Sequence, residues 1–166
     1  WLEVTDICNL KCLGCYRQKL TGHKTLEAVK EEILFLKKWR NVDNLSIAGG
    51  EPLMYPDIME VVSFAKEQGI KPIMLTNGLK LDQPTVVELK KAGLAGFTIH
   101  IDSNQGRPEW RDKNEIETNE LRQHFADMIY DVGGLYVIFN STVYPSTVQH
   151  IPEMTRWAQK NIDRVH

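Results

Sequence analysis

The sequence has few cysteines, no long apolar run and no strong charge bias. It contains 3 cysteines in 166 residues. No stretch approaches the roughly 20 consecutive apolar residues that a membrane span needs, and the start lacks the basic-then-apolar pattern of a signal peptide. Because 20 lysines and arginines nearly balance 22 aspartates and glutamates, we expect neither a nucleic-acid surface nor a polybasic membrane anchor.

The placement of the cysteines is unusual, because all 3 lie between Cys8 and Cys15. An odd number cannot pair fully in disulfides, and the rest of the chain offers no further cysteine. Hydrophobic residues make up 42% of the chain and charged residues 25%, so a core can form without disulfide bonds. Clustered cysteines in such a chain indicate a metal site in a reducing compartment, and we therefore expect a cytoplasmic protein.

Short apolar runs alternate with amphipathic helical patterns, which is typical of βα units that build a parallel sheet. Strands are expected at 1–6, 45–48, 72–76, 95–101 and 135–139, and helices at 25–39, 57–68, 85–92, 121–132 and 151–160. The first three helix starts carry cap residues, which are Thr25, the pair Asp57 and Glu60, and the pair Thr85 and Glu88.

The fourth predicted strand separates its side chains by face. One face is apolar, and the other carries Thr98, His100 and Asp102. A parallel sheet with helices on both faces would be apolar on both sides. The polar set therefore favours a barrel or half-barrel, in which helices cover the outside and the inner face lines a cavity near the strand ends.

The predicted α/β fold has five βα units in one domain, residues 1–166. A sixth strand would be due where the sequence stops, and the first residue is Trp1, so we expect a piece of a longer chain. The polar segment 103–114 is expected to be a loop. For residues 104–111 within it, a solvated connector is the simplest interpretation, and a contact for a polar substrate is the alternative.

The cysteines form the motif Cys8-Asn-Leu-Lys-Cys12-Leu-Gly-Cys15 directly after the first predicted strand. Three thiolates in so short a loop can converge on one metal centre. Zinc with His23 as a fourth ligand is one alternative, and three reduced structural cysteines are another. An iron–sulfur cubane normally takes four cysteines, so three would leave one iron open to bind another molecule.

Polar motifs also stand at the ends of the next two strands. Gly49-Gly50-Glu51-Pro52 follows the second strand, where the glycines allow the backbone to approach a ligand closely and Pro52 stiffens the turn. Glu51 can accept a hydrogen bond from a ligand's ammonium group. Thr76, Asn77 and Gly78 end the third strand. A plain turn is the alternative interpretation at both places.

The fourth and fifth strands end in polar residues as well. His100, Asp102 and Ser103 stand at the carboxyl end of the fourth strand, where folds of this kind bind ligands. His100 is either a histidine of the cavity wall or a substrate contact. Asn140 ends the fifth strand, and a capping asparagine is its alternative interpretation.

Taken in order, the three-cysteine motif, the Gly-Gly-Glu-Pro motif and the Thr-Asn-Gly motif resemble the radical S-adenosylmethionine (SAM) superfamily. The resemblance runs over essentially the whole chain. It is strongest to the branch that includes enzymes maturing molybdenum cofactor, nitrogenase cofactor and peptide-derived quinones. The implied fold is a partial (β/α)6 barrel whose sixth strand is missing from this sequence.

The resemblance implies an enzyme core with two cofactors. Cys8, Cys12 and Cys15 would hold a [4Fe–4S] cluster, and the open iron would be chelated by the methionine part of SAM. Reductive cleavage of SAM would then give a 5′-deoxyadenosyl radical that abstracts hydrogen from a substrate. The substrate and any catalytic side chain stay unknown, and an electron donor such as a flavodoxin or ferredoxin is an implied partner.

The same resemblance assigns further residues to the SAM site. It places Glu51 near the ammonium group of SAM, and Asp102 and Ser103 near its ribose or carboxylate. The remaining implied contacts are Gly49, Gly50 and Pro52 in the second-strand turn, Thr76 and Asn77 near polar groups, Asn140 at the ribose, and Tyr16 near the adenine.

Overall fold

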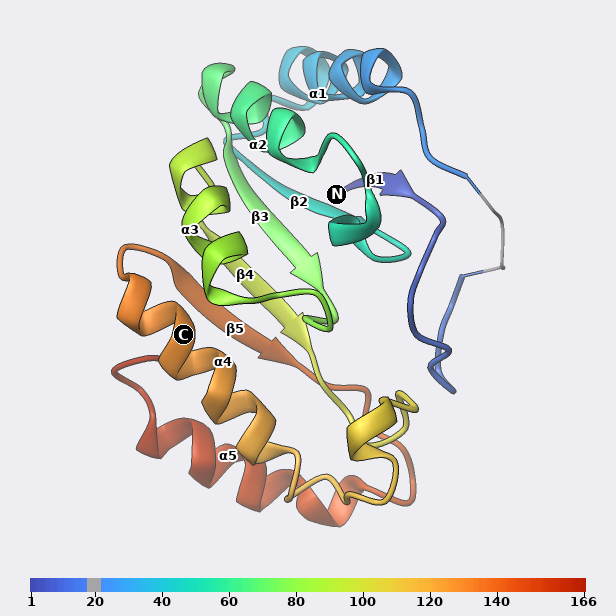
Figure 1. Ribbon diagram of the computed structural model, residues 1–166, viewed down its shortest axis with the longest axis vertical. Helices are drawn as coiled ribbons and strands as arrows, with labels where there is room; N and C mark the ends of the chain where they lie inside the picture. The colour runs from blue at the N-terminus through green and yellow to red at the C-terminus, as the bar shows by residue number, and fades with distance from the viewer. Residues whose placement is uncertain (18–21) are drawn as a thin grey trace.

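The computed structural model describes residues 1–17 and 22–166 (Figure 1). The described strands are β1 (Leu2–Thr5), β2 (Asn44–Gly49), β3 (Lys71–Thr76), β4 (Gly96–His100) and β5 (Tyr136–Asn140). The helices are α1 (Leu26–Arg40), α2 (Ile58–Glu67), α3 (Gln83–Ala92), α4 (Asn119–Val132) and α5 (Ile151–Lys160). Short 3-10 turns lie at η1 (Pro52–Met54), η2 (Pro108–Trp110) and η3 (Val148–His150). In this part of the chain, none of the helices is long and apolar enough to cross a bilayer.

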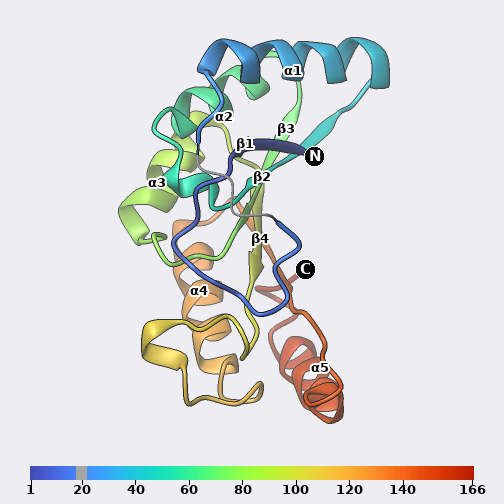
Figure 2. The same ribbon diagram turned by 90° about the vertical axis from the view of Figure 1, so that its right-hand side faces the viewer.

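The strands form one sheet in the order β1-β2-β3-β4-β5, and every neighbouring pair is parallel. Sequential order with parallel pairing requires each helix to cross back over the sheet in the same sense. The helices α2, α3 and α4 accordingly lie side by side along the sheet, with α1 near its β1 end and α5 beyond α4 (Figures 1 and 2). The ring of Trp157 on α5 packs against that of Phe139 on β5. This arrangement is the predicted α/β partial barrel.

The core lies between the sheet and these helices. It is built from alternate strand residues and one face of each of the helices α1 to α4, and β4 illustrates the rule. Phe97 and Ile99 are fully buried, whereas Thr98 and His100 on the opposite face are half-buried. The predicted separation of apolar and polar faces is confirmed. Burying each large apolar side chain contributes about 1.5–3 kcal/mol, so the apolar face fixes which side of the strand faces the helices.

The cap predictions had mixed outcomes. Thr25 caps α1 as expected, since its hydroxyl accepts a hydrogen bond from the amide of Ala28 at 3.2 Å. The prediction for Thr85 was wrong, because α3 begins at Gln83 and is capped by Asp82. A proline in the first turn of α3 explains the earlier start, since its fixed φ suits that position. Asp57 precedes α2 but its side chain makes no cap hydrogen bond.

Candidate functional site

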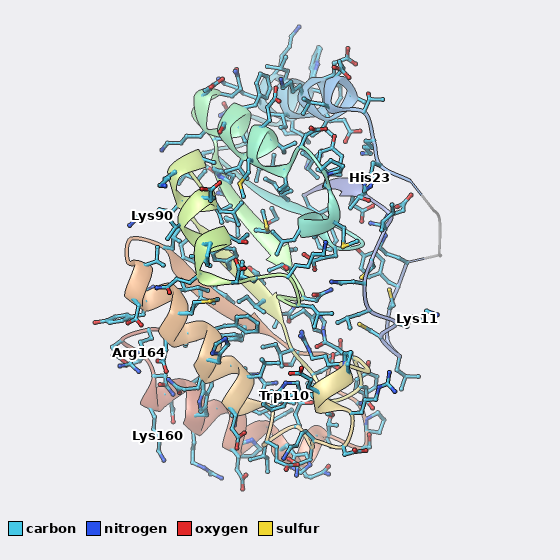
Figure 3. All side chains as sticks on the ribbon, viewed as in Figure 1. Lys11, His23, Lys90, Trp110, Lys160 and Arg164 are labelled. Atoms are coloured by element: carbon cyan, nitrogen blue, oxygen red, sulfur yellow. The ribbon has the colours of Figure 1, made fainter. Side chains whose placement is uncertain are left out.

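Because the strands are parallel, their carboxyl ends meet at one edge of the sheet, and the cysteine loop (residues 8–15) lies at this edge. Lys11 of that loop stands on the side toward which the strand arrows point (Figure 3). Two backbone hydrogen bonds tie the approach to the loop to the turn after β2, from Gly50 N to Thr5 O at 2.7 Å and from Glu51 N to Ile7 O at 2.8 Å. A third bond joins Leu13 N of the loop to Asn104 O, after β4, at 3.0 Å.

The three cysteines are free thiols. Cys8 and Cys15 are exposed, and Cys12 is half-buried. Partial loss of hydration around the sulfur raises the pKa of Cys8, and the same effect together with the negative charge of Asp102 raises the pKa of Cys12 to about 11. Negative charge on neighbouring cysteines adds to the rise of both pKa values.

The sulfur atoms share a loop without being gathered at one point. Within residues 1–17 and 22–166, no three His, Cys, Asp or Glu side chains are placed to hold a metal ion. Three thiolates repel one another, and the free energy of metal binding is what normally brings such ligands together. The donor set nevertheless fits an iron–sulfur cluster, because it consists of three free thiols in one short loop.

His23, the fourth ligand of the zinc alternative, has other partners. Its ring packs edge-on against Tyr55 with 5.6 Å between centroids, and its backbone forms an isolated antiparallel bridge with Thr5. The described structure therefore does not bring His23 together with the cysteines as a metal site.

The two glycines at the end of β2 are required by close backbone packing. A Cβ on Gly49, where φ is +143°, would lie 2.4 Å from Thr5 O. A Cβ on Gly50 would lie 2.3 Å from Ile7 O. The sequence suggested that these glycines admit a ligand, and the contact observed is with the backbone that leads into the cysteine loop. Their small size lets the β2 turn and this loop meet.

Glu51 is fully buried and bonded to the protein itself. Its Oε1 accepts hydrogen bonds from Thr76 Oγ1 at 2.6 Å and from Leu53 N at 3.1 Å, and its Oε2 accepts one from Asn77 N at 2.7 Å. Burial raises the pKa of this carboxyl, although the three hydrogen bonds oppose the rise. Pro52 follows as the first residue of η1, so the whole Gly-Gly-Glu-Pro motif is rigidly placed.

Asn77 joins this carboxylate to the cysteine loop. Its side-chain amide donates to Asn9 Oδ1 at 2.8 Å and lies 3.8 Å from the sulfur of Cys8. Its Oδ1 accepts from the amide of Leu79 at 2.9 Å, which closes the turn after β3. We call Glu51, Thr76 and Asn77 the Glu51 network.

A second polar group lies at the end of β4. His100 Nε2 is 2.8 Å from Asp102 Oδ2 and 3.2 Å from Thr142 Oγ1. Asp102 is buried, and its Oδ1 accepts from the amide of Asn104 at 2.8 Å. The backbone amide of Ser103 donates to Glu115 Oε2 at 2.9 Å. Because β4 pairs in parallel with β3, Asp102 and Ser103, which follow β4, lie at the same edge as the Glu51 network.

Asn140 and Tyr16 are connected less closely to these groups. Asn140 pairs with His100 in the register of β4 and β5, and its carbonyl accepts from the amide of Ile101 at 2.9 Å. Tyr16 is exposed and donates its hydroxyl hydrogen to Glu3 Oε1 at 3.0 Å, beside β1. Their predicted contacts with SAM stay predictions.

Sequence reasoning missed the buried charged residues of the segment after β4. Arg107 and Glu115 are buried, and Glu115 forms an ion pair with Arg122, itself buried on α4. The simplest interpretation of residues 104–111, a solvated connector, was therefore wrong for part of this segment, because Arg107 is buried. A signal for Arg122 was present, because it shares one helical face with Phe125 and Ile129. No comparable periodicity marks Arg107.

Comparison with known proteins bears on this site. A family model described as the radical SAM superfamily matches residues 2–158. The chain belongs to this superfamily. Its members use a [4Fe–4S] cluster and SAM, so the cofactors implied by the motifs are those of the family. Nothing in the comparisons supports the zinc alternative.

Two curated relatives are enzymes with different names. The probable GTP 3′,8-cyclase of Methanocaldococcus jannaschii is 33% identical over 106 residues, covering 61% of this chain and 35% of the relative. The Fe-coproporphyrin III synthase of Methanosarcina barkeri is 32% identical over 108 residues, covering 60% of this chain and 26% of the relative. The chain spans 54% of the length of a third relative, the probable GTP 3′,8-cyclase of Methanococcus maripaludis strain C5, and a smaller share of the two named above.

A solved radical SAM structure agrees with the fold. Streptococcus suis SuiB, bound to its precursor peptide SuiA, superposes with a TM-score of 0.71 and 22% identity, over 96% of this chain and 36% of SuiB. At this identity the match shows the fold, and it confirms the partial barrel.

Proposed function

We propose that residues 1–166 form the cofactor-binding core domain of a radical SAM enzyme. In this proposal Cys8, Cys12 and Cys15 hold a [4Fe–4S] cluster, and SAM binds across the carboxyl ends of the strands. The observation that carries it is the position of the cysteine loop. Backbone hydrogen bonds hold this region against the turns after β2 and β4, and Asn77 links the loop to β3.

The cofactor supplies the chemistry and the chain supplies its surroundings. A reduced cluster held by Cys8, Cys12 and Cys15 would supply the electron for cleavage of SAM to methionine and a 5′-deoxyadenosyl radical, and that radical would abstract hydrogen from the substrate. Three thiolates leave one iron without a protein ligand, which is the position proposed for SAM. The buried side chains at the strand ends exclude water from the site and hold its polar groups in fixed directions.

The residues proposed for SAM fall into two groups. Gly49, Gly50, Glu51, Pro52, Thr76 and Asn77 form the firmly held side near β2 and β3. The proposed contacts on the other side are Asp102, Ser103, Asn140 and Tyr16. Within that side, the carboxylate of Asp102 orients the imidazole of His100 toward the polar face of β4.

The substrate is left open, and the redox partner is proposed only by class. The cyclase and synthase named among the relatives act on different molecules, so similarity does not select a substrate. We infer a small electron-transfer protein of the flavodoxin or ferredoxin type as donor. We also retain the prediction of a cytoplasmic location, which rests on the clustered reduced cysteines.

Anaerobic reconstitution with iron and sulfide tests this function. The expected product is a brown protein that forms 5′-deoxyadenosine from SAM when dithionite is added. A colourless protein with one tightly bound zinc would overturn the proposal. His23→Ala separates the two metal interpretations, because it should leave iron loading unchanged but would release a zinc held by Cys8, Cys12, Cys15 and His23.

A further inference from the structure

Arg107 is a buried cation in the segment that follows β4. The residue is 3% exposed, although the segment around it is polar and glycine-containing. Its guanidinium donates to Gln105 Oε1 at 2.7 Å, to His100 O at 2.9 Å and to Asn77 O. The last two acceptors are backbone carbonyls at the ends of β4 and β3, so one side chain joins these two strand ends.

The charge of Arg107 has no direct counter-ion among residues 1–17 and 22–166. The other buried arginine at this edge, Arg122, forms an ion pair with Glu115, whereas Arg107 bonds to neutral oxygen atoms. A buried charge without a paired partner is costly, because it loses its hydration. A buried ionisable group with a specific set of charged neighbours is a candidate for a functional role.

The negative groups that act most strongly on Arg107 belong to the candidate site. Burial lowers the pKa of Arg107, whereas negative charge on Cys12, Asp102 and Glu51, in that order, raises it. The segment of Arg107 also packs on the cysteine loop. Leu13 N, next to Cys12, donates to Asn104 O at 3.0 Å, and Lys11 O lies 3.9 Å from a Cβ built on Gly106.

We propose that Arg107 provides a fixed positive charge beside the three-cysteine site, and that this charge raises the reduction potential of the cluster bound there. The inference rests on the proposed function, which it extends to a residue outside the family motifs. A nearby positive charge stabilises the state that carries one more electron, and the effect is large where little water screens it. Net charge around an iron–sulfur cluster is a known determinant of its potential.

The midpoint potential of the reconstituted cluster, measured without SAM, tests the inference. Arg107→Met and Arg107→Gln remove the charge, and Gln keeps a side-chain amide donor in case the Met variant does not fold. Arg107→Lys keeps the charge and loses most of the hydrogen bonds. Arg111→Met removes an exposed arginine of the same segment and serves as the matched control.

We expect the two neutral variants to shift the potential to a more negative value, with Arg107→Lys and Arg111→Met close to the wild type. A wild-type potential in a neutral variant that loads its cluster would overturn the inference. An equal shift in Arg107→Lys would also overturn it, since hydrogen bonds rather than charge would then set the potential. A wild-type protein that loads no cluster would instead overturn the proposed function, so the two failures are distinguishable.

Discussion

The cysteine loop and the Glu51 network lie at the same edge of the sheet but are held in different ways. In the network, the Glu51 carboxylate is fully buried and accepts three hydrogen bonds from the protein. In the loop, the thiols of Cys8 and Cys15 are exposed. The backbone of the loop region is anchored at several points, while its sulfur atoms have few partners.

This difference separates two tasks. The network gives the edge its rigidity through contacts that the chain makes by itself. The thiols contribute little to the stability of the iron-free protein, and their proposed role is to bind metal. Changes in the Glu51 network should therefore mainly lower stability, whereas changes of the cysteines should mainly lower cofactor binding.

The largest expected effect is on cofactor binding, from Cys15→Ala. We expect complete loss of the intact cluster and of SAM cleavage, because two cysteines cannot replace three. The free energy of unfolding of the iron-free protein should change by no more than about 0.5 kcal/mol, since Cys15 is exposed. Iron and sulfide analysis together with urea unfolding measures both quantities.

Leu13→Ala is the matched control in the same loop. Leu13 is 75% exposed, and its backbone amide bond to Asn104 does not depend on its side chain. Iron loading should stay at the wild-type level. Equal iron loading in Cys15→Ala and Leu13→Ala would contradict the assigned role of the cysteine.

The next effect is on stability, from Glu115→Ala in the buried polar segment after β4. The change leaves Arg122, which is 2% exposed, without its ionic partner. Breaking one side of a buried pair costs about 3–5 kcal/mol, because the remaining charge stays buried. Urea unfolding of the iron-free protein provides the measurement. Glu117→Ala, an exposed glutamate of the same region, should cost far less.

Much of this edge was predictable from the sequence because local patterns determine it. The order of strands and helices follows from hydrophobic periodicity, and the cysteine spacing follows from the chemistry of one metal centre. The parity of β4 correctly indicated which face is polar. These features depend on residues that are close together in the chain.

The missed features depend on contacts between distant residues. Arg107 is buried because its donors meet carbonyls at the ends of β3 and β4, and no local pattern encodes that meeting. Gly50 was attributed to ligand approach, and its tight contact is with Ile7 O. Asp82 replaced Thr85 as the cap of α3, because a proline in the first turn extended the helix.

A moderate effect is expected where the two regions touch, from Gly50→Ala. The new Cβ would lie 2.3 Å from Ile7 O, so the backbone leading into the cysteine loop must move. Forcing an extra carbon into a tightly packed place costs about 1–3 kcal/mol, and the displaced loop should also hold less iron. Gly22→Ala is the control, because its Cβ would meet no atom within 4 Å. Equal stability and iron content in the two variants would contradict the close packing.

The smallest expected effect is a pH dependence that comes from Glu51. Burial raises the pKa of this carboxyl above its ordinary value of 4.5. The folded state therefore favours the protonated form, and the resulting stabilisation is fully present below pH 4.5 and is lost as the pH rises through the folded-state pKa. Glu51→Gln cannot titrate, so the wild type should lose stability relative to this variant over that range.

Glu117 provides a control of opposite sign. A hydrogen bond from the backbone of Asn114 lowers its pKa, as does its bond with Lys113, so its stabilisation is present above its ordinary pKa and lost as the pH falls. Urea unfolding of the wild type, Glu51→Gln and Glu117→Gln between about pH 3 and pH 8, the range over which carboxyl groups and histidine titrate, compares the two. The difference between wild type and variant should slope downward with pH for Glu51 and upward for Glu117. Slopes of the same sign would show that burial does not govern the pKa of Glu51. The contrast between the buried Glu51 network and the exposed surface would then not hold.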